Sequence, residues 1–219
     1  MNEPIPPRSA IRANSSQRIY QSVMADLEAG RMVPGQRLAE TDLANRFGVG
    51  RNAVREAMQQ LAARGVIDLH QHRSPTIRLL DRAETCGVLD VAEALTALVA
   101  RSAATGYDVE AHRSLLESAL DMLSQADLID EAGSFSRARR HFYRALLAIG
   151  NNKELQRLFP AIGMHIIYAQ YQTRQLRGIR IADYRQIAKA VAQQNPDLAE
   201  KAGRDHVRHV KHIVMQEAS

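Results

Sequence analysis

Two arginines and an asparagine form a group of side chains suited to reading DNA bases. Arg51 and Arg55 are one helical turn apart and lie on the same side of a helix that begins near Arg51. Arginine can bridge O6 and N7 of guanine with two hydrogen bonds, and Asn52 can pair in a similar way with adenine. A solvated helix face would show the same arginine pair, so the interpretation depends on the surrounding elements.

Those elements predict a winged helix-turn-helix. Periodic apolar residues and glycine breaks indicate three helices followed by a β-hairpin wing. The helices are expected at residues 18–29, 40–47 and 52–64, and the strands at 66–69 and 76–80. We therefore assign residues 15–80 to a DNA-binding domain. Residues 1–14, rich in proline, arginine and asparagine, are expected to be a mobile basic arm.

From residue 81 onward the sequence predicts helices only. Asp81 and Glu84 have the spacing of a capping box, and Asn195-Pro196 has the pattern of a helix start. Helices are expected from Asp81 to Gly106, from Asp108 onward, and at about 132–150, 153–171, 183–194 and 196–216. Short connections favour an antiparallel packing. The fold class is mainly α, with residues 81–219 forming an all-helical bundle that binds an effector and dimerises.

Composition agrees with a DNA-binding protein of the cytoplasm. The formal net charge is +5, and the first 80 residues contain 11 arginines against seven acidic side chains. The lone Cys86 suits a reducing compartment. No apolar run reaches about 18 residues, and the N-terminus lacks the apolar stretch of a secretory signal. The P-loop, nucleophile-elbow, GxGxxG and HExxH motifs are all missing, so we expect no catalytic residues, no cofactor and no membrane partner.

Two sequence runs resemble the GntR family of bacterial regulators, and specifically its FadR-type branch with an FCD effector domain. One run reads GRMVPGQRLAE from Gly30, and the other reads GVGRNAVREA from Gly48. The resemblance implies a homodimer on a palindromic DNA operator. It also implies DNA contacts from seven residues, which are Thr41, Gly50, Arg51, Asn52, Arg55, His72 and Arg73.

The same runs also depart from the family pattern. Gly50, Asn52 and Ala53 stand where the family usually has Ser or Thr, Thr and Pro. Gly50 removes a hydroxyl that would cap the helix or bind a phosphate, and Asn52 adds a base-reading amide. The operator is therefore expected to differ from the family's usual one. Arg73 in the wing could reach the minor groove or a phosphate, and the sequence leaves both options open.

The C-terminal half resembles an FCD domain through two segments. One is FYRAL from Phe142 with Gly150-Asn151-Asn152, and the other joins Ile187, Ala190, Ala199 and His206. Many FCD domains bind a divalent metal through one Asp and three His. At the matching positions this sequence has Arg139, Tyr143 and Tyr184, and only His206 is kept. Because an arginine cannot ligate a cation, we expect no metal.

Arg139 suggests an anion site in place of the metal. Its guanidinium could bind a ligand carboxylate directly, with Tyr143, Tyr184 and His206 completing an effector site for an organic acid, with an aromatic acid as one option. Alternatively, Arg139 pairs with Asp90 or Glu93 and the pocket is vestigial. The leading interpretation is a ligand-responsive repressor. The alternatives are a constitutive DNA-binding regulator and a helical-bundle metalloenzyme. The loss of the metal ligands argues against the metalloenzyme.

Overall fold

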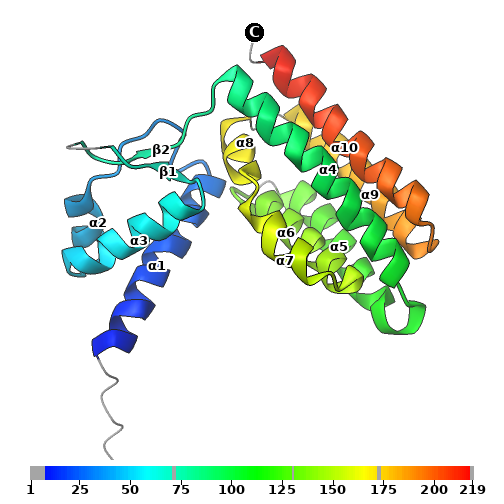
Figure 1. The fold of residues 1–219 in the computed structure, drawn as a ribbon, viewed down its shortest axis with the longest axis horizontal. Helices are drawn as coiled ribbons and strands as arrows, with labels where there is room; N and C mark the ends of the chain where they lie inside the picture. The colour runs from blue at the N-terminus through cyan, green and yellow to red at the C-terminus, as the bar shows by residue number, and fades with distance from the viewer. Residues whose placement is uncertain (1–7, 71–72, 130, 172–173, 218–219) are drawn as a thin grey trace, which may run out of the picture. The chain divides into compact units, whose positions relative to one another are not determined.

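The computed structural model describes residues 8–70, 73–129, 131–171 and 174–217, and the chain divides into two compact units (Figure 1). The first unit ends at Leu79 and the second begins at Leu80. None of the helices in these residues is both long and apolar enough to cross a membrane.

The N-terminal unit is a winged helix-turn-helix. Its elements are α1 (Arg8–Glu28), α2 (Glu40–Phe47), α3 (Arg51–Ala63), β1 (Ile67–Asp68) and β2 (Thr76–Ile77). The two strands are antiparallel, with Ile67 opposite Ile77. Apolar side chains of α1 and α3 form the core, and those with no exposed surface are Ile19, Val23, Leu27, Val54, Ala57 and Leu61. The predicted fold of this unit is confirmed.

Two boundaries differ from the expectation. Helix α1 begins at Arg8, well before residue 18, so residues 8–14 are helical where a mobile arm was expected. Arginine and alanine in this stretch favour helix although its apolar periodicity is weak. The strands are shorter than expected, and Leu69 and Leu79 beyond their ends are exposed. A two-stranded ribbon gives such positions no neighbouring strand to pack against.

The second unit is all-helical. Its long helices are α4 (Arg82–Gly106), α5 (Val109–Ile129), α6 (Ser134–Gly150), α9 (Arg174–Ala192) and α10 (Pro196–Glu217), and its short ones are α7 (Lys153–Leu158), the 3-10 turn η1 (Phe159–Ala161) and α8 (Met164–Gln170). Helix α4 packs against α6 and α10, and α5 packs against α6 and α9 (Figure 1). Gly203 lets α10 approach α4 closely, because an added Cβ would lie 2.8 Å from the Thr96 carbonyl oxygen.

The helix start that has a capping box lies where the sequence predicts it, whereas two other helix boundaries differ from the prediction. The capping box between Asp81 and Glu84 forms both of its hydrogen bonds, at 2.8 and 3.1 Å. The helix expected at 153–171 is instead divided into α7, η1 and α8 around Pro160, which lacks an N–H donor. The helix expected at 183–194 begins at Arg174, so a stretch expected to be a loop adds more than two turns to α9.

Candidate functional site

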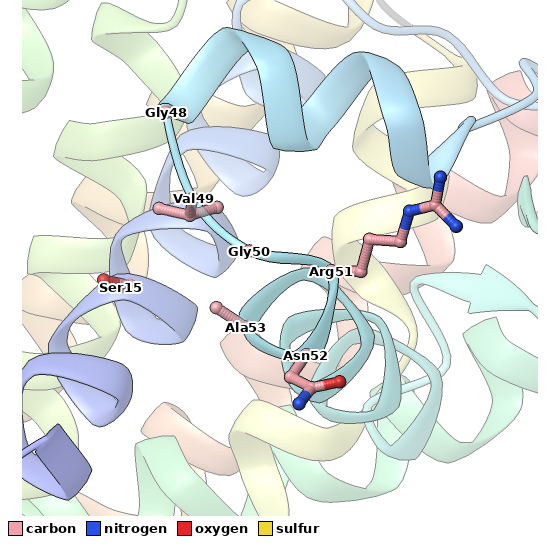
Figure 2. Close-up of a pocket in the computed structure, with 7 residues that line it drawn as sticks. All are labelled: Ser15, Gly48, Val49, Gly50, Arg51, Asn52 and Ala53. Atoms are coloured by element: carbon pink, nitrogen blue, oxygen red, sulfur yellow. The ribbon is translucent and has the colours of Figure 1, made fainter.

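The turn between α2 and α3 presents the start of α3 to solvent. Gly48 ends α2 in the left-handed conformation with φ of 61°, which glycine adopts without strain. Gly50 then caps α3 without a side-chain hydrogen bond. Arg51, Asn52 and Arg55 are exposed. Figure 2 shows Arg51 and Asn52 projecting from the first turn of α3 in different directions.

A hollow of about 430 Å³ adjoins this turn. Its walls are Ser15 of α1 and residues 48–53 of the α2–α3 turn (Figure 2). Arg51 points away from Ser15 (Figure 2). The hollow therefore leaves the N-terminal turn of α3 accessible from outside the domain.

The other sequence-predicted DNA contacts lie at separate places in this unit. Thr41 is exposed on the first turn of α2, and Arg73 is exposed between the two strands. His72 lies outside the described residues. Arg55 donates a hydrogen bond from Nε to Glu40 at 3.1 Å, which ties α3 to the start of α2. The sequence analysis missed this partner.

A buried carboxylate of α1 connects that helix to α2. Asp26 of α1 is 3% exposed and forms ion pairs with Arg46 at 2.6 Å and Arg31 at 2.7 Å. Burial alone would raise the pKa of Asp26, but the hydrogen bonds and charges of the two arginines lower it. Arg46 lies on α2, so its ion pair with Asp26 holds α2 against α1 and supports the turn between α2 and α3.

The second unit brings the sequence-predicted effector residues together around an aromatic cluster. Tyr143 of α6 and Tyr184 of α9 have ring centroids 5.7 Å apart, and Tyr184 lies 4.7 Å from the ring of His206 of α10. The guanidinium carbon of Arg139 lies 3.1 Å from the ring centroid of Tyr168 of α8. Burial raises the pKa of both Tyr143 and Tyr184, so their hydroxyls stay protonated.

A second buried arginine, missed by the sequence analysis, belongs to this cluster. Arg180 of α9 is 5% exposed, as is Arg139. Its guanidinium carbon lies 4.4 Å from the centroid of the same Tyr168 ring. Arg180 is one turn before Tyr184, a spacing that would have indicated it if α9 had been expected to begin early enough. Neither arginine forms an ion pair with any residue that the structure describes.

The acids proposed as internal partners of Arg139 are engaged elsewhere. Asp90 pairs with Lys211 of α10. Glu93 pairs with Arg208 at 2.9 Å and with Arg204 at 3.8 Å. Arg139 is therefore a buried cation that neither acid neutralises.

His206 already has an anionic partner. Its Nδ1 lies 3.1 Å from a carboxylate oxygen of Asp183, which also bonds His209. Burial lowers the pKa of His206 and the Asp183 carboxylate opposes this shift. Burial alone would raise the pKa of Asp183, but the two histidines lower it. Neutral His206 then donates from Nδ1 to Asp183 and offers Nε2 as an acceptor.

This set of residues does not fit a divalent metal. Positively charged Arg139 and the protonated hydroxyls of Tyr143 and Tyr184 stand at the positions where the sequence comparison placed an Asp and two His. Among the residues that the structure describes, no three or more His, Cys, Asp or Glu side chains are arranged to hold a metal ion. That the protein binds no metal stays a prediction.

Two family models match the chain in the two units just described. Residues 15–77 match the model for bacterial regulatory proteins of the gntR family, and residues 87–209 match the FCD domain. The chain belongs to the GntR family. GntR regulators bind DNA and FCD domains bind small-molecule effectors, so this family member is a transcriptional regulator and not an enzyme.

Curated relatives and solved structures agree with the family. A probable D-xylose utilization operon transcriptional repressor from Paenarthrobacter nicotinovorans is 23% identical over 198 residues, covering 90% of this chain and 87% of that protein. The HTH-type transcriptional repressor RspR from Escherichia coli K12 is 22% identical over 207 residues, covering 92% and 89%. The structure of E. coli McbR/YncC has a TM-score of 0.77 at 18% identity, covering 94% of this chain and 99% of that one. At this identity, the structural likeness shows the fold alone.

Proposed function

We propose that this GntR-family regulator is a homodimeric repressor that binds a palindromic operator in the cytoplasm and responds to a small carboxylate. The DNA-binding half of the proposal rests on the exposed N-terminal turn of α3. Recognition helices of this motif present their first turns to base edges in the major groove. A two-fold symmetric protein places two such helices on two half-sites, which favours a palindrome.

The proposed DNA-contacting residues fall into base-reading and phosphate-binding groups. Arg51 and Arg55 read guanine, and Asn52 reads adenine. The N–H groups that follow Gly50 have no side-chain cap, which suits a DNA phosphate at the positive end of the helix dipole. Thr41 of α2 is proposed to contact a phosphate. Arg73 and His72 are each proposed to contact a phosphate or the minor groove.

Arg51→Ala tests the DNA-binding proposal. Arg51 is exposed and forms no ion pair within the described residues, so its loss should leave folding unchanged. Operator affinity should fall by about 1–3 kcal/mol for a lost base contact. Arg113→Ala is the matched control, because it removes an exposed arginine of α5 in the second unit. Fluorescence anisotropy with an operator selected from random DNA measures both. Equal affinity of Arg51→Ala and wild type would refute the assignment.

The effector half of the proposal rests on the buried, unpaired guanidinium of Arg139. A buried cation without an anionic partner costs several kcal/mol, so a bound carboxylate would stabilise the folded unit. Tyr143 and Tyr184 add hydroxyl donors, and the Nε2 acceptor of neutral His206 suits a hydroxyl group of the same ligand and not its carboxylate. A panel of organic acids should therefore include one that raises the melting temperature of the full chain. At 100 times its Kd, that acid should raise the free energy of unfolding by about 2.7 kcal/mol. A panel without effect would favour the rival constitutive regulator.

A further inference from the structure

The two buried arginines of the second unit share one aromatic ring. Arg139 comes from α6 and Arg180 from α9, and their guanidinium carbons lie 3.1 and 4.4 Å from the ring centroid of Tyr168. The two guanidinium carbons can therefore be no farther apart than the sum of these distances. We call Arg139 and Arg180 the arginine pair. Two like charges this close together repel each other strongly at a site with little access to water.

No carboxylate of the described residues neutralises the arginine pair. Asp183, one turn from Arg180, is engaged by His206 and His209. Asp90 and Glu93 are engaged by basic residues of α10. Within the described part of the chain, neither member of the pair has an ion-pair partner. Tyr168 offers only the face of a neutral ring, which compensates a cation partly.

Arg180 also has hydrogen-bond donors that no atom in the described part of the chain accepts. Its Nε and Nη2 atoms are buried without a hydrogen-bond partner, as is the hydroxyl of Tyr184. Nε and Nη2 form the edge of a guanidinium that donates two parallel hydrogen bonds to a carboxylate or phosphate. Unsatisfied buried donors are rare in folded proteins, and one common explanation is a partner that binds. Burial is the largest cause that lowers the pKa of Arg180, and the charge of Arg139 makes a smaller contribution in the same direction.

We infer that the arginine pair binds a small dianion, a molecule that carries two negative charges, such as a dicarboxylate or a phosphate monoester. The inference rests on the proposed effector site and specifies its ligand. One acid group receives the Nε and Nη2 donors of Arg180, with the hydroxyl of Tyr184 beside them. The second negative charge neutralises Arg139. A monocarboxylate would leave one of the two buried cations without a counter-ion.

Matched ligand pairs test this inference on the full chain at constant ionic strength. Succinate and butyrate have the same carbon chain and differ in one carboxylate, and glycerol phosphate supplies a phosphate monoester. At slightly alkaline pH both succinate and glycerol phosphate are dianions. Isothermal titration calorimetry should give at least about tenfold tighter binding of one of these dianions than of butyrate. Preference for succinate assigns a dicarboxylate, and preference for glycerol phosphate assigns a phosphate monoester.

Arg180→Gln provides the variant arm. It should weaken dianion binding by about tenfold or more and bring it close to that of butyrate. Without ligand the variant should melt no lower than wild type, because it removes a buried, uncompensated charge. Arg180→Lys keeps the charge but loses the two-donor edge. This variant should therefore fold like wild type but bind dianions more weakly. Arg185→Gln is the matched control, since Arg185 is an exposed arginine of the same helix.

Three results would overturn the inference. Equal binding of succinate, glycerol phosphate and butyrate would refute the dianion but leave the proposed carboxylate site in place. Binding of none of the three would refute both. A lower melting temperature of Arg180→Gln together with unchanged ligand affinities would show that Arg180 has a structural partner.

Discussion

The pair formed by Glu40 and Arg55 leads to a quantitative prediction about DNA reading. Glu40 accepts the Nε hydrogen bond of Arg55 at 3.1 Å, which leaves the two Nη groups to face a guanine. We expect Glu40 to orient Arg55 without touching DNA itself. Arg55→Ala should weaken operator binding by about 1–3 kcal/mol, or roughly 5- to 160-fold. Glu40→Gln should weaken it less, because it loosens the orientation of Arg55 and leaves the guanidinium in place.

The same pair should contribute little to folding. The side chain of Arg55 is 62% exposed and that of Glu40 is 33% exposed. Ion pairs of this exposure contribute about 0–1 kcal/mol to stability. Both single variants should therefore melt close to wild type, so that a loss of DNA binding cannot be attributed to unfolding.

A double-mutant cycle measures the coupling between the two residues. Operator affinities of wild type, Glu40→Gln, Arg55→Ala and the double variant are compared at one salt concentration by fluorescence anisotropy. We expect a coupling of more than about 0.5 kcal/mol, as for residues in one hydrogen-bond network. Arg64→Ala combined with Glu40→Gln is the control and should be additive. Additive effects of Glu40→Gln and Arg55→Ala would refute the orienting role of Glu40.

Three further predictions concern sequence choice, pH and metal. Asn52→Thr should change the base preference in a DNA selection more than it changes affinity for random DNA, and an unchanged selected motif would contradict base reading by Asn52. The melting temperature should fall as pH drops below about 6.5, because the unfolded chain takes up a proton that buried His206 does not; this dependence should weaken in His206→Gln. Elemental analysis after purification without a chelator or a metal-affinity tag should find no stoichiometric zinc, manganese or nickel. One metal per chain would mean that Arg139, Tyr143 and Tyr184 were misplaced at the ligand positions.

The sequence predicted best those elements whose signals are local. Asp81 and Glu84 need only each other to form a capping box, and both bonds are present. Gly48 and Gly50 mark the break between α2 and α3, which the structure places as expected. In each case a few neighbouring residues fix the backbone, so no distant contact can override them.

The effector cluster depended on contacts that no local pattern encodes. Arg180 falls between the helices expected at 153–171 and 183–194, because no clear sequence signal marks the start of α9 at Arg174. Tyr168 lies on α8, which the sequence merged into one longer helix across Pro160. The partner of His206 is Asp183 on another helix, and that pairing comes from tertiary packing alone. The sequence thus grouped four residues that lie in one cluster but missed the second guanidinium, and the role of the four in effector binding stays a prediction.

We propose that a carboxylate bound at Arg139 controls DNA binding, and a titration of Arg139→Ala tests this proposal. Operator affinity is measured by fluorescence anisotropy for wild type and Arg139→Ala, with and without the acid that most raises the wild-type melting temperature. We expect the acid to change wild-type affinity at least about fivefold, in either direction, while Arg139→Ala binds the operator like wild type and does not respond. If Arg139→Ala instead melts lower than wild type and responds to the acid as wild type does, Arg139 is a structural residue and the claim is wrong.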